Sequence, residues 1–194
     1  VTMGAATTAA YTITLKMVND EEGYIAGPFW KEFKANLKKG SILGVIALFA
    51  CYAVYLDFQL YHVAKQHNMM FLIVGVIGIY LIFMHIVFAF PLLARYENSI
   101  VNTMRNSYSI AAKFLGRTAF LAVLLVIEMA IILWNLTTMF AGLLIGPACI
   151  ILTISGFANS FFTVIERENL MAEQEEKEST HLNGEPISGD EDDI

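Results

Sequence analysis

Charge is scarce in this chain, and the scarcity narrows the class of protein. Only 15% of the 194 residues are Asp, Glu, Lys or Arg, whereas 57% are hydrophobic. Soluble domains carry about 25% charged residues, so this composition indicates a membrane protein. The stretch 69–90 contains no charged residue at all, which favours a lipid environment for that segment.

Cysteine is rare as well, and the motifs of common enzyme classes are missing. Cys51 and Cys149 lie inside apolar runs, so we interpret them as buried small hydrophobic residues rather than a disulfide or a metal pair. The chain contains no G-x-S-x-G, P-loop, H-E-x-x-H or dinucleotide-binding sequence. His62, His67 and His85 do not have the spacing of a metal site on one helix face. We therefore predict no enzyme activity, no catalytic residue, no metal site and no cofactor.

Four apolar segments predict transmembrane helices, because about 20 residues at 1.5 Å per residue cross a hydrocarbon core of about 30 Å. These segments are 41–61, 69–90, 118–136 and 142–165. We expect Pro91 to end the second span and Gly146-Pro147 to kink the fourth. Residues 137–141 are the predicted uncharged turn between the third and fourth spans.

Three further helices complete the predicted all-α membrane protein, a polytopic helical bundle. Residues 1–18 carry small residues four apart, starting at Gly4, which let helices in a bilayer pack closely. This helix either spans the membrane or ends a span that begins before Val1, where the chain starts without a methionine. Residues 28–39 and 98–113 are amphipathic and basic, so we expect them to lie on the cytoplasmic membrane surface.

Basic residues beside the spans are candidate contacts for a partner or for lipid headgroups. This set comprises Lys31, Lys34, Lys38, Arg95 and Arg105, with the acid Glu97 beside them. We expect Arg95 to hold a headgroup phosphate, and Glu97 to cap the following helix or to pair with Arg95 or Arg105. The segments that carry these bases are continuous with predicted membrane spans. We therefore predict that the bases contact lipid headgroups rather than nucleic acid. Along 98–113 we expect an apolar face formed by Ile100, Met104, Tyr108, Ala111 and the following Leu115.

Three polar residues within the spans form the candidate intramembrane site. Glu128 lies near the middle of its span, where an acid costs about 3 kcal/mol on insertion scales. It is either a proton, cation or substrate site, or a protonated acid that hydrogen-bonds a neighbouring helix. Asp57 is either functional or a wetted carboxylate, which Lys65 could neutralise. His85 either relays protons or binds metal, or it bonds a backbone carbonyl or a hydroxyl.

The distribution of charge predicts the orientation. The connectors 31–40 and 91–117 carry four bases each, whereas Lys65 is the only base in the opposite loops. By the positive-inside rule, both connectors and the C-terminal tail are cytoplasmic. Residues 166–194 hold 11 acids against two bases. This segment is too polar to bury enough apolar surface, so we predict a disordered acidic tail.

A weak internal repeat is also present. Residues 28–61 and 98–136 both contain a basic amphipathic helix, a glycine (Gly40 and Gly116) and then a span. Two such units in one orientation would form a parallel repeat, which some transporters use. A simple chain of helical hairpins produces the same order, and both interpretations stay open.

Three stretches of the chain form a pattern in their order and spacing. They are GAATTAAYTITLKMVNDEEGYI (Gly4–Ile25), PFWKEFKANLKKGSILG (Pro28–Gly44) and FPLLARYENSIVNTMRNSY (Phe90–Tyr108). Together they resemble the YesL family, bacterial integral membrane proteins of unknown function, over about residues 1–170. The resemblance highlights Gly4, Thr7, Thr8, Pro91, Arg95 and Glu97, without assigning them a role. It implies a multi-pass protein of the bacterial cytoplasmic membrane, often encoded beside genes for carbohydrate uptake and polysaccharide degradation.

These observations favour a non-enzymatic accessory or regulatory component linked to carbohydrate uptake or polysaccharide utilisation. Its expected partners are the lipid bilayer and a carbohydrate transporter or sensor protein in the membrane. The alternative is an autonomous transporter of small solutes or ions that uses Glu128. A third hypothesis, an intramembrane enzyme, depends only on Glu128 and His85.

Overall fold

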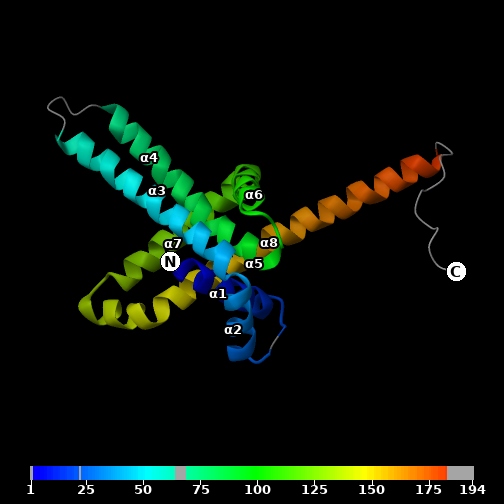
Figure 1. Cartoon of the computed structure of the whole chain (residues 1–194), viewed down its shortest axis with the longest axis horizontal. Helices are drawn as coiled ribbons and strands as arrows, with labels where there is room; N and C mark the ends of the chain where they lie inside the picture. Colours follow the sequence, from blue (N-terminus) through cyan, green and yellow to red (C-terminus); the bar gives the residue numbers. More distant parts are fainter. Residues whose placement is uncertain (1, 22, 64–68, 183–194) are drawn as a thin grey trace. The chain divides into compact units, whose positions relative to one another are not determined.

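The described part of the chain is helical throughout, and it contains no strand. The computed structural model describes residues 2–21, 23–63 and 69–182 (Figure 1). Its helices are α1 (Met3–Val18), α2 (Ala26–Ala35), α3 (Leu37–Val63), α4 (Met69–Met84), the π-helical turn η1 (His85–Ala89), α5 (Phe90–Arg95), α6 (Ile100–Lys113), α7 (Leu115–Ile132) and α8 (Leu136–Leu182). The predicted all-α class is confirmed for these residues.

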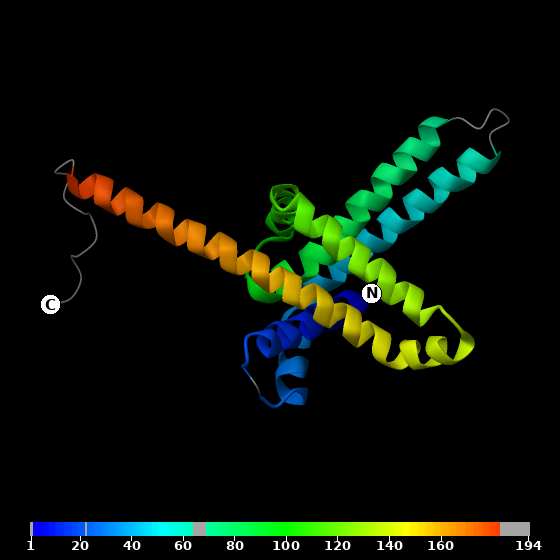
Figure 2. The same ribbon diagram turned by 180° about the vertical axis from the view of Figure 1, so that it is seen from behind.

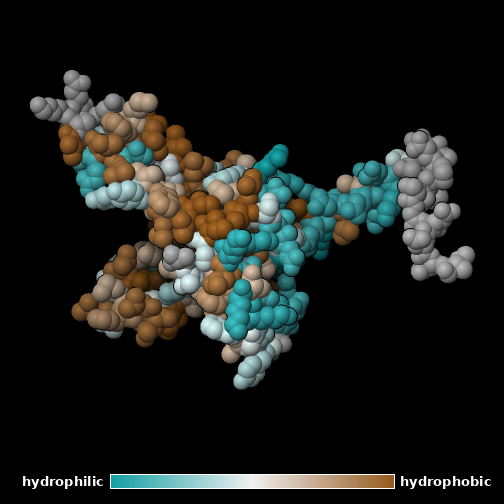
Figure 3. All heavy atoms as spheres, viewed as in Figure 1, coloured by the Kyte–Doolittle hydropathy of each residue, from teal (hydrophilic) through white to brown (hydrophobic). Residues whose placement is uncertain are grey.

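Four helical stretches are long and apolar enough to cross a membrane. They are Leu37–Val63, Met69–Arg95, Leu115–Ile132 and Leu136–Ser179. At most 28% of the most apolar window of each stretch is buried inside the protein. The remaining apolar side chains face outward, and Figure 3 shows hydrophobic surface over the helices involved. Lipid is the environment in which such a surface is stable, so these helices indicate a multi-pass membrane protein.

Glycine residues set the packing of two antiparallel helix pairs. Helices α3 and α4 lie side by side (Figure 1), and a Cβ at Gly78 would be 2.5 Å from Cγ2 of Val54. Helix α7 lies beside the first part of α8 (Figures 1 and 2). A Cβ at Gly142 would be 2.6 Å from Cγ2 of Ile132, and one at Gly146 would be 2.8 Å from its Cδ1. In both pairs a missing side chain makes room for a branched residue of the partner helix.

Helix α1 contains more buried residues than any other described helix, and it packs against α2, α3 and α5. Its closest approach is to α3, where a Cβ at Gly4 would lie 2.1 Å from the carbonyl oxygen of Gly40. Thr8 is fully buried in the same crossing, and its hydroxyl donates to the Gly4 carbonyl at 2.9 Å. Thr14 is hydrogen-bonded to Ser155 of α8 at 2.6 Å. Close packing by small residues in α1 is thus confirmed, whereas a membrane span there stays a prediction.

Backbone hydrogen bonds close the C-terminal end of α1. The N–H of Glu21 donates to the carbonyl of Lys16 at 3.0 Å, and that of Asp20 donates to Met17 at 3.2 Å. This pair of bonds is the Schellman motif, which needs a residue in the left-handed conformation. Asp20 occupies that position with a φ of 57°. Glycine adopts this backbone conformation with less strain than any other residue.

The second apolar stretch differs from its predicted end at Pro91. The helix continues through Pro91 to Arg95, after the π-helical turn His85–Ala89. In a regular α-helix the proline ring meets the carbonyl of the residue four positions earlier, here Val87. The wider turn separates these groups, so the chain accommodates Pro91 in the first turn of α5 without ending the stretch.

The turn between α7 and α8 also differs from the prediction of 137–141. It lies at residues 133–135, and α8 has already begun at Leu136. Asn135 Oδ1 accepts from the N–H of Thr138 at 2.9 Å, and Thr138 Oγ1 accepts from the N–H of Asn135 at 3.0 Å. This reciprocal pair is a capping box, which starts a helix in place of the expected turn.

The tail is more ordered than predicted from Glu166 onward, because α8 continues to Leu182. Residues 166–182 are rich in helix-forming Glu, Gln, Met, Leu and Ala, and Glu173 precedes Lys177 by one helical turn. Residues 183–194 of the predicted tail lie outside the described residues. Helix contacts divide the chain into the units Val1–Ala158 and Asn159–Ile194, and the site below lies in the first unit.

The two proposed repeat units share their helix order but not their packing. Helices α2, α3 and α4 follow one another as α6, α7 and α8 do, with single-residue breaks at Asn36 and Phe114. A Cβ at Gly40 would lie 2.8 Å from Cα of Ala5, whereas one at Gly116 meets nothing within 4 Å. The glycines at corresponding positions therefore have different roles, which weakens the argument for a duplication.

Candidate functional site

Glu128 lies on α7 and is bonded to α8. The hydroxyl of Thr153 donates to Oε1 of Glu128, and both side chains are partly buried. Among the described residues, the other carboxylate oxygen, Oε2, is buried without a hydrogen-bond partner. The contact with Thr153 is the hydrogen bond to a neighbouring helix that one of the two sequence interpretations expects. It links the two helices of a hairpin within the apolar region, where each polar pair stabilises by about 0.6–2 kcal/mol.

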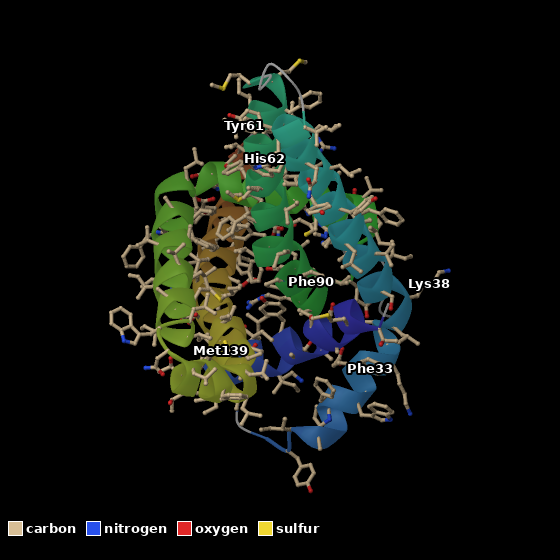
Figure 4. All side chains as sticks on the ribbon, turned by 90° about the vertical axis from the view of Figure 1, so that its left-hand side faces the viewer. Phe33, Lys38, Tyr61, His62, Phe90 and Met139 are labelled. Carbon is tan, nitrogen blue, oxygen red and sulfur yellow. The ribbon has the colours of Figure 1, made fainter. Side chains whose placement is uncertain are left out.

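His85 begins the π-helical turn and is 4% exposed. Its Nε2 lies 3.2 Å from the carbonyl oxygen of Leu43 on α3. A carbonyl can only accept, so Nε2 carries the hydrogen. The ring of Phe90 lies edge-on at 5.9 Å between centroids, and Figure 4 shows Phe90 near α1. The bond to Leu43 fits the interpretation that His85 binds a backbone carbonyl. Its other ring nitrogen, Nδ1, is buried and has no hydrogen-bond partner in the described chain.

Asp57 and His85 border the same cavity, whereas Glu128 is not among its lining residues. The cavity has a volume of about 380 Å³ and lies between α3, α4, η1 and α6. Its walls are largely apolar, and Tyr108 of α6 borders it as well. The structure therefore brings two of the three predicted intramembrane polar residues to one cavity and leaves the third on another helix pair.

Asp57 is partly buried, and it forms no hydrogen bond or ion pair within the described ranges. Lys65, which we expected could neutralise it, lies outside those ranges. Tyr108 is half-buried on α6, and burial raises the pKa of its phenol, so the hydroxyl keeps its proton. The cavity thus combines apolar walls, a neutral hydroxyl and a carboxylate that has no counter-charge among the described residues.

The start of α6 corrects the prediction for Glu97. Ser99 is the N-cap, and its Oγ accepts from the N–H of Asn102 at 3.3 Å. Glu97 lies two residues earlier, is exposed, and forms no ion pair with Arg95 or Arg105 among the described residues. The Oγ of Ser99 lies next to the first helical residue and can reach the free backbone N–H groups of the first turn. Glu97 lies two positions earlier and forms no such bond within the described ranges.

The buried residues of α6 coincide only in part with the predicted apolar face. Ala111 of that face is buried, whereas Ile100, Met104 and Tyr108 are partly buried and Leu115 is exposed. The other buried residues of α6 are Thr103, Ser107 and Ile110. The Thr103 hydroxyl donates to the Ser99 carbonyl at 3.0 Å, and the Ser107 hydroxyl donates to the Thr103 carbonyl at 2.7 Å. These small polar side chains are buried with their hydroxyls bonded to the backbone of their own helix, and α6 packs against η1.

The basic residues beside the spans lie next to exposed or half-buried aromatic rings. Nζ of Lys34 is 5.4 Å from the centroid of the Trp30 ring, and the Arg95 guanidinium carbon is 5.9 Å from that of Tyr96. Phe114 has both Lys113 and Arg117 within 5.8 Å. Pairs of rings and cations of this kind are typical of the region where lipid headgroups meet hydrocarbon.

Helix α2 exposes its basic side chains and buries no residue. Lys31 and Lys34 are exposed, and the stacked rings of Phe33 and Trp30 are 5.3 Å apart. Lys38 was predicted within this helix but lies in the first turn of α3, because α2 ends at Ala35. Figure 4 shows its side chain directed away from α3.

Helical connectivity places these bases at one end of the membrane stretches. A hairpin that crosses a membrane twice returns to the side from which it started. In a membrane that both stretches cross, the beginning of α3 and the end of α5 would lie on one side, and α6 is too short and too polar to cross before α7 begins. On that topology Lys31, Lys34, Arg95 and Arg105 would share a membrane side.

The two cysteines were predicted to be buried, and that prediction is wrong. Cys51 and Cys149 are free and exposed on α3 and α8. An apolar pattern does not distinguish a residue that faces the protein from one that faces lipid. No group of three or more His, Cys, Asp or Glu within the described chain is arranged to hold a metal ion.

Comparison with known families gives a match to part of the chain. The family described as "Protein of unknown function, DUF624" matches residues 1–58, which cover α1, α2 and most of α3. Two of the three stretches that resemble the YesL family, Gly4–Ile25 and Pro28–Gly44, fall within the match, and Phe90–Tyr108 lies outside it. No curated protein and no solved structure matches the chain.

Proposed function

We propose that this membrane protein is a non-enzymatic accessory or regulatory component of carbohydrate uptake or polysaccharide utilisation. It acts in the bacterial cytoplasmic membrane, with its basic connectors and its C-terminal tail in the cytoplasm. The partner is a carbohydrate transporter or a sensor protein in the same membrane. The carbohydrate part of the proposal rests on the resemblance to the YesL family.

The exposed basic connectors are the observation that carries the proposal. Arg105 on α6, Lys31 and Lys34 on α2, and Lys38 at the start of α3 are exposed, and none forms an ion pair among the described residues. They share one membrane side with the half-buried Arg95. Such a surface suits an acidic patch of a partner protein at the level of the headgroups.

The contacts of the polar residues within the spans support an accessory role. Glu128 accepts a hydrogen bond from Thr153, which links α7 to α8. His85 is hydrogen-bonded to the Leu43 carbonyl, which links η1 to α3. A transport path requires polar groups that face a common water-filled route. The carboxylate of Glu128 and the cavity beside Asp57 belong to different helix pairs.

Charge reversal of the connectors tests the proposal. We expect Lys34→Glu combined with Arg105→Glu to reduce the uptake of a labelled sugar by cells that depend on the protein. The matched control is Lys65→Glu, which reverses a charge in the connector between α3 and α4. Uptake that is equal in both variants and in the wild type, at equal protein levels, contradicts an accessory role of this surface.

One observation favours the alternative of an autonomous transporter of small solutes or ions. Oε2 of Glu128 is buried and has no partner among the described residues, so a transported proton or cation could use it. In proteoliposomes, this alternative predicts a flux that Glu128→Gln abolishes. The absence of any flux, or a flux that the substitution leaves unchanged, removes Glu128 as a transport residue.

A further inference from the structure

The cavity between α3, α4, η1 and α6 has the size and the lining of a ligand site. Ligand pockets commonly hold about 300–1,000 Å³, are mostly apolar and carry few polar groups. This cavity measures about 380 Å³. Neither the accessory role nor the transporter alternative uses it, so what it binds is a separate question.

The shape of the cavity follows from the faces of α3 and α4. Ala47, Ala50, Val54 and Asp57 are spaced three, four and three residues apart, so they lie along one face of α3. On α4 the lining residues extend from Val74 to Ile82. The lining of α3 runs from Ile46 to Asp57, and the rise between these two residues is about 16 Å at 1.5 Å per residue. The cavity is therefore a slot parallel to the helices, with Asp57 at the end near the α3–α4 connector.

Asp57 is the only charged residue among the described residues that line the slot. His85 cannot serve as a polar contact at the wall, because Nε2 is bonded to Leu43 and Nδ1 is buried below the surface. Tyr108 of α6 also lines the slot, and its hydroxyl is neutral because burial raises the pKa of the phenol. A carboxylate against apolar walls is costly unless a cation or a hydrogen-bond donor reaches it.

These features define the ligand by its chemistry. We propose that the slot binds an amphiphilic organic cation, whose ammonium group contacts the Asp57 carboxylate and whose alkyl chain lies between α3, α4 and α6. An extended chain covers about 3.3–3.6 Å for every three bonds, so a slot of about 16 Å accommodates about a dozen carbons. A neutral or anionic amphiphile of the same length lacks the contact with Asp57.

Photo-crosslinking tests this assignment on the full chain in phosphatidylcholine vesicles. The probe is an alkyl ammonium of about a dozen carbons, as derived from the slot length, with a diazirine in its chain. The comparison probe is the uncharged alcohol of the same length. Labelled positions are mapped by mass spectrometry. We expect the ammonium probe to label the stretches 46–57 and 74–82 about tenfold more than the alcohol does, which corresponds to about 1.4 kcal/mol.

Two variants separate the charge from the volume of the slot. Asp57→Asn removes the charge with little change of shape, and we expect it to bring the ammonium labelling down to the level of the alcohol. Ala50→Phe fills the slot and leaves the charge, and we expect it to abolish the labelling. Asp20→Asn makes the same carboxylate-to-amide change at an exposed position outside the slot, and labelling should persist.

Two results overturn the proposal. Equal labelling by both probes that Asp57→Asn leaves unchanged means that an ordinary lipid chain occupies the slot. Labelling that never reaches 46–57 or 74–82 means that the slot is not a binding site. Equal thermal stability of Asp57→Asn and wild type in the same vesicles ensures that a loss of labelling reports binding rather than unfolding. The outcome is independent of the charge-reversal experiment on the connectors.

Discussion

The crossing of α1 and α3 makes the sharpest prediction about the fold. A Cβ at Gly4 would lie 2.1 Å from the carbonyl oxygen of Gly40 and 3.0 Å from the N atom of Gly44. Carbon and carbonyl oxygen approach one another to about 3.3 Å at closest, so Gly4→Ala forces α1 away from α3 by about 1 Å. Backbone atoms on both sides leave no flexible side chain that could move instead.

The expected cost follows from this displacement. Overpacking a close-packed contact costs about 1–3 kcal/mol, and a gap of about 1 Å also weakens the remaining contacts along the crossing. We place Gly4→Ala at about 2–3 kcal/mol. For a protein of this size, that corresponds to a fall of about 5–10 °C in the unfolding midpoint. Gly4→Val should lower the midpoint further, because it adds two more methyl groups at the same point.

Gly156→Ala is the matched control, since a Cβ at this helical glycine meets nothing within 4 Å. There the expected change is a gain of up to about 1 kcal/mol from helix propensity. Both variants are purified in the same detergent and heated, and the fraction that stays monodisperse in size-exclusion chromatography is measured. The reasoning is refuted if Gly4→Ala is as stable as the wild type, or if both alanines have the same effect.

Two other substitutions test contacts of the described structure, with the same thermal assay. Thr153→Val removes the only hydrogen-bond donor found for Glu128 within the described chain, and we expect a loss of about 1–3 kcal/mol, whereas Thr153→Ser should keep most of the stability. If Thr153→Val were as stable as Thr153→Ser, the hydrogen bond between Thr153 and Glu128 would contribute nothing to stability. Asp20→Gly relieves a left-handed backbone position and should stabilise by about 0.5–1 kcal/mol; a loss of stability would contradict the Schellman end of α1.

The membrane helices could be predicted from the sequence because length and hydropathy are sufficient signals. An apolar run such as 69–90 needs no knowledge of its neighbours to be identified as a candidate span. The small residues of α1 were equally informative, because Gly4 and Thr8 pack closely in any helix pair that places them at the crossing.

The ends of helices were harder to predict, since they depend on single hydrogen bonds. The capping pair Asn135 and Thr138 moves a turn by several residues, and Ser99 takes the position that we assigned to Glu97. Pro91 was interpreted as a helix end because the π-helical turn before it has no sequence signal of its own.

The candidate site could be predicted only in part. The sequence identifies Asp57 and His85 as polar residues in apolar runs, but their meeting at one cavity depends on how α3, α4 and α6 pack. Tyr108 was missed as a lining residue, because it was assigned to an apolar face of a surface helix. Hydropathy also could not show that Cys51 and Cys149 are exposed, since lipid and protein interior select the same residue types.

Affinity purification of the full-length protein from native membranes tests the central claim most directly. The account predicts that a carbohydrate transporter or a sensor protein co-purifies with the wild type and with Lys65→Glu. It also predicts that this partner is lost from the variant with both Lys34→Glu and Arg105→Glu. Recovery of the protein alone, as a stable self-assembly in all three preparations, would contradict an accessory role and would favour an autonomous transporter.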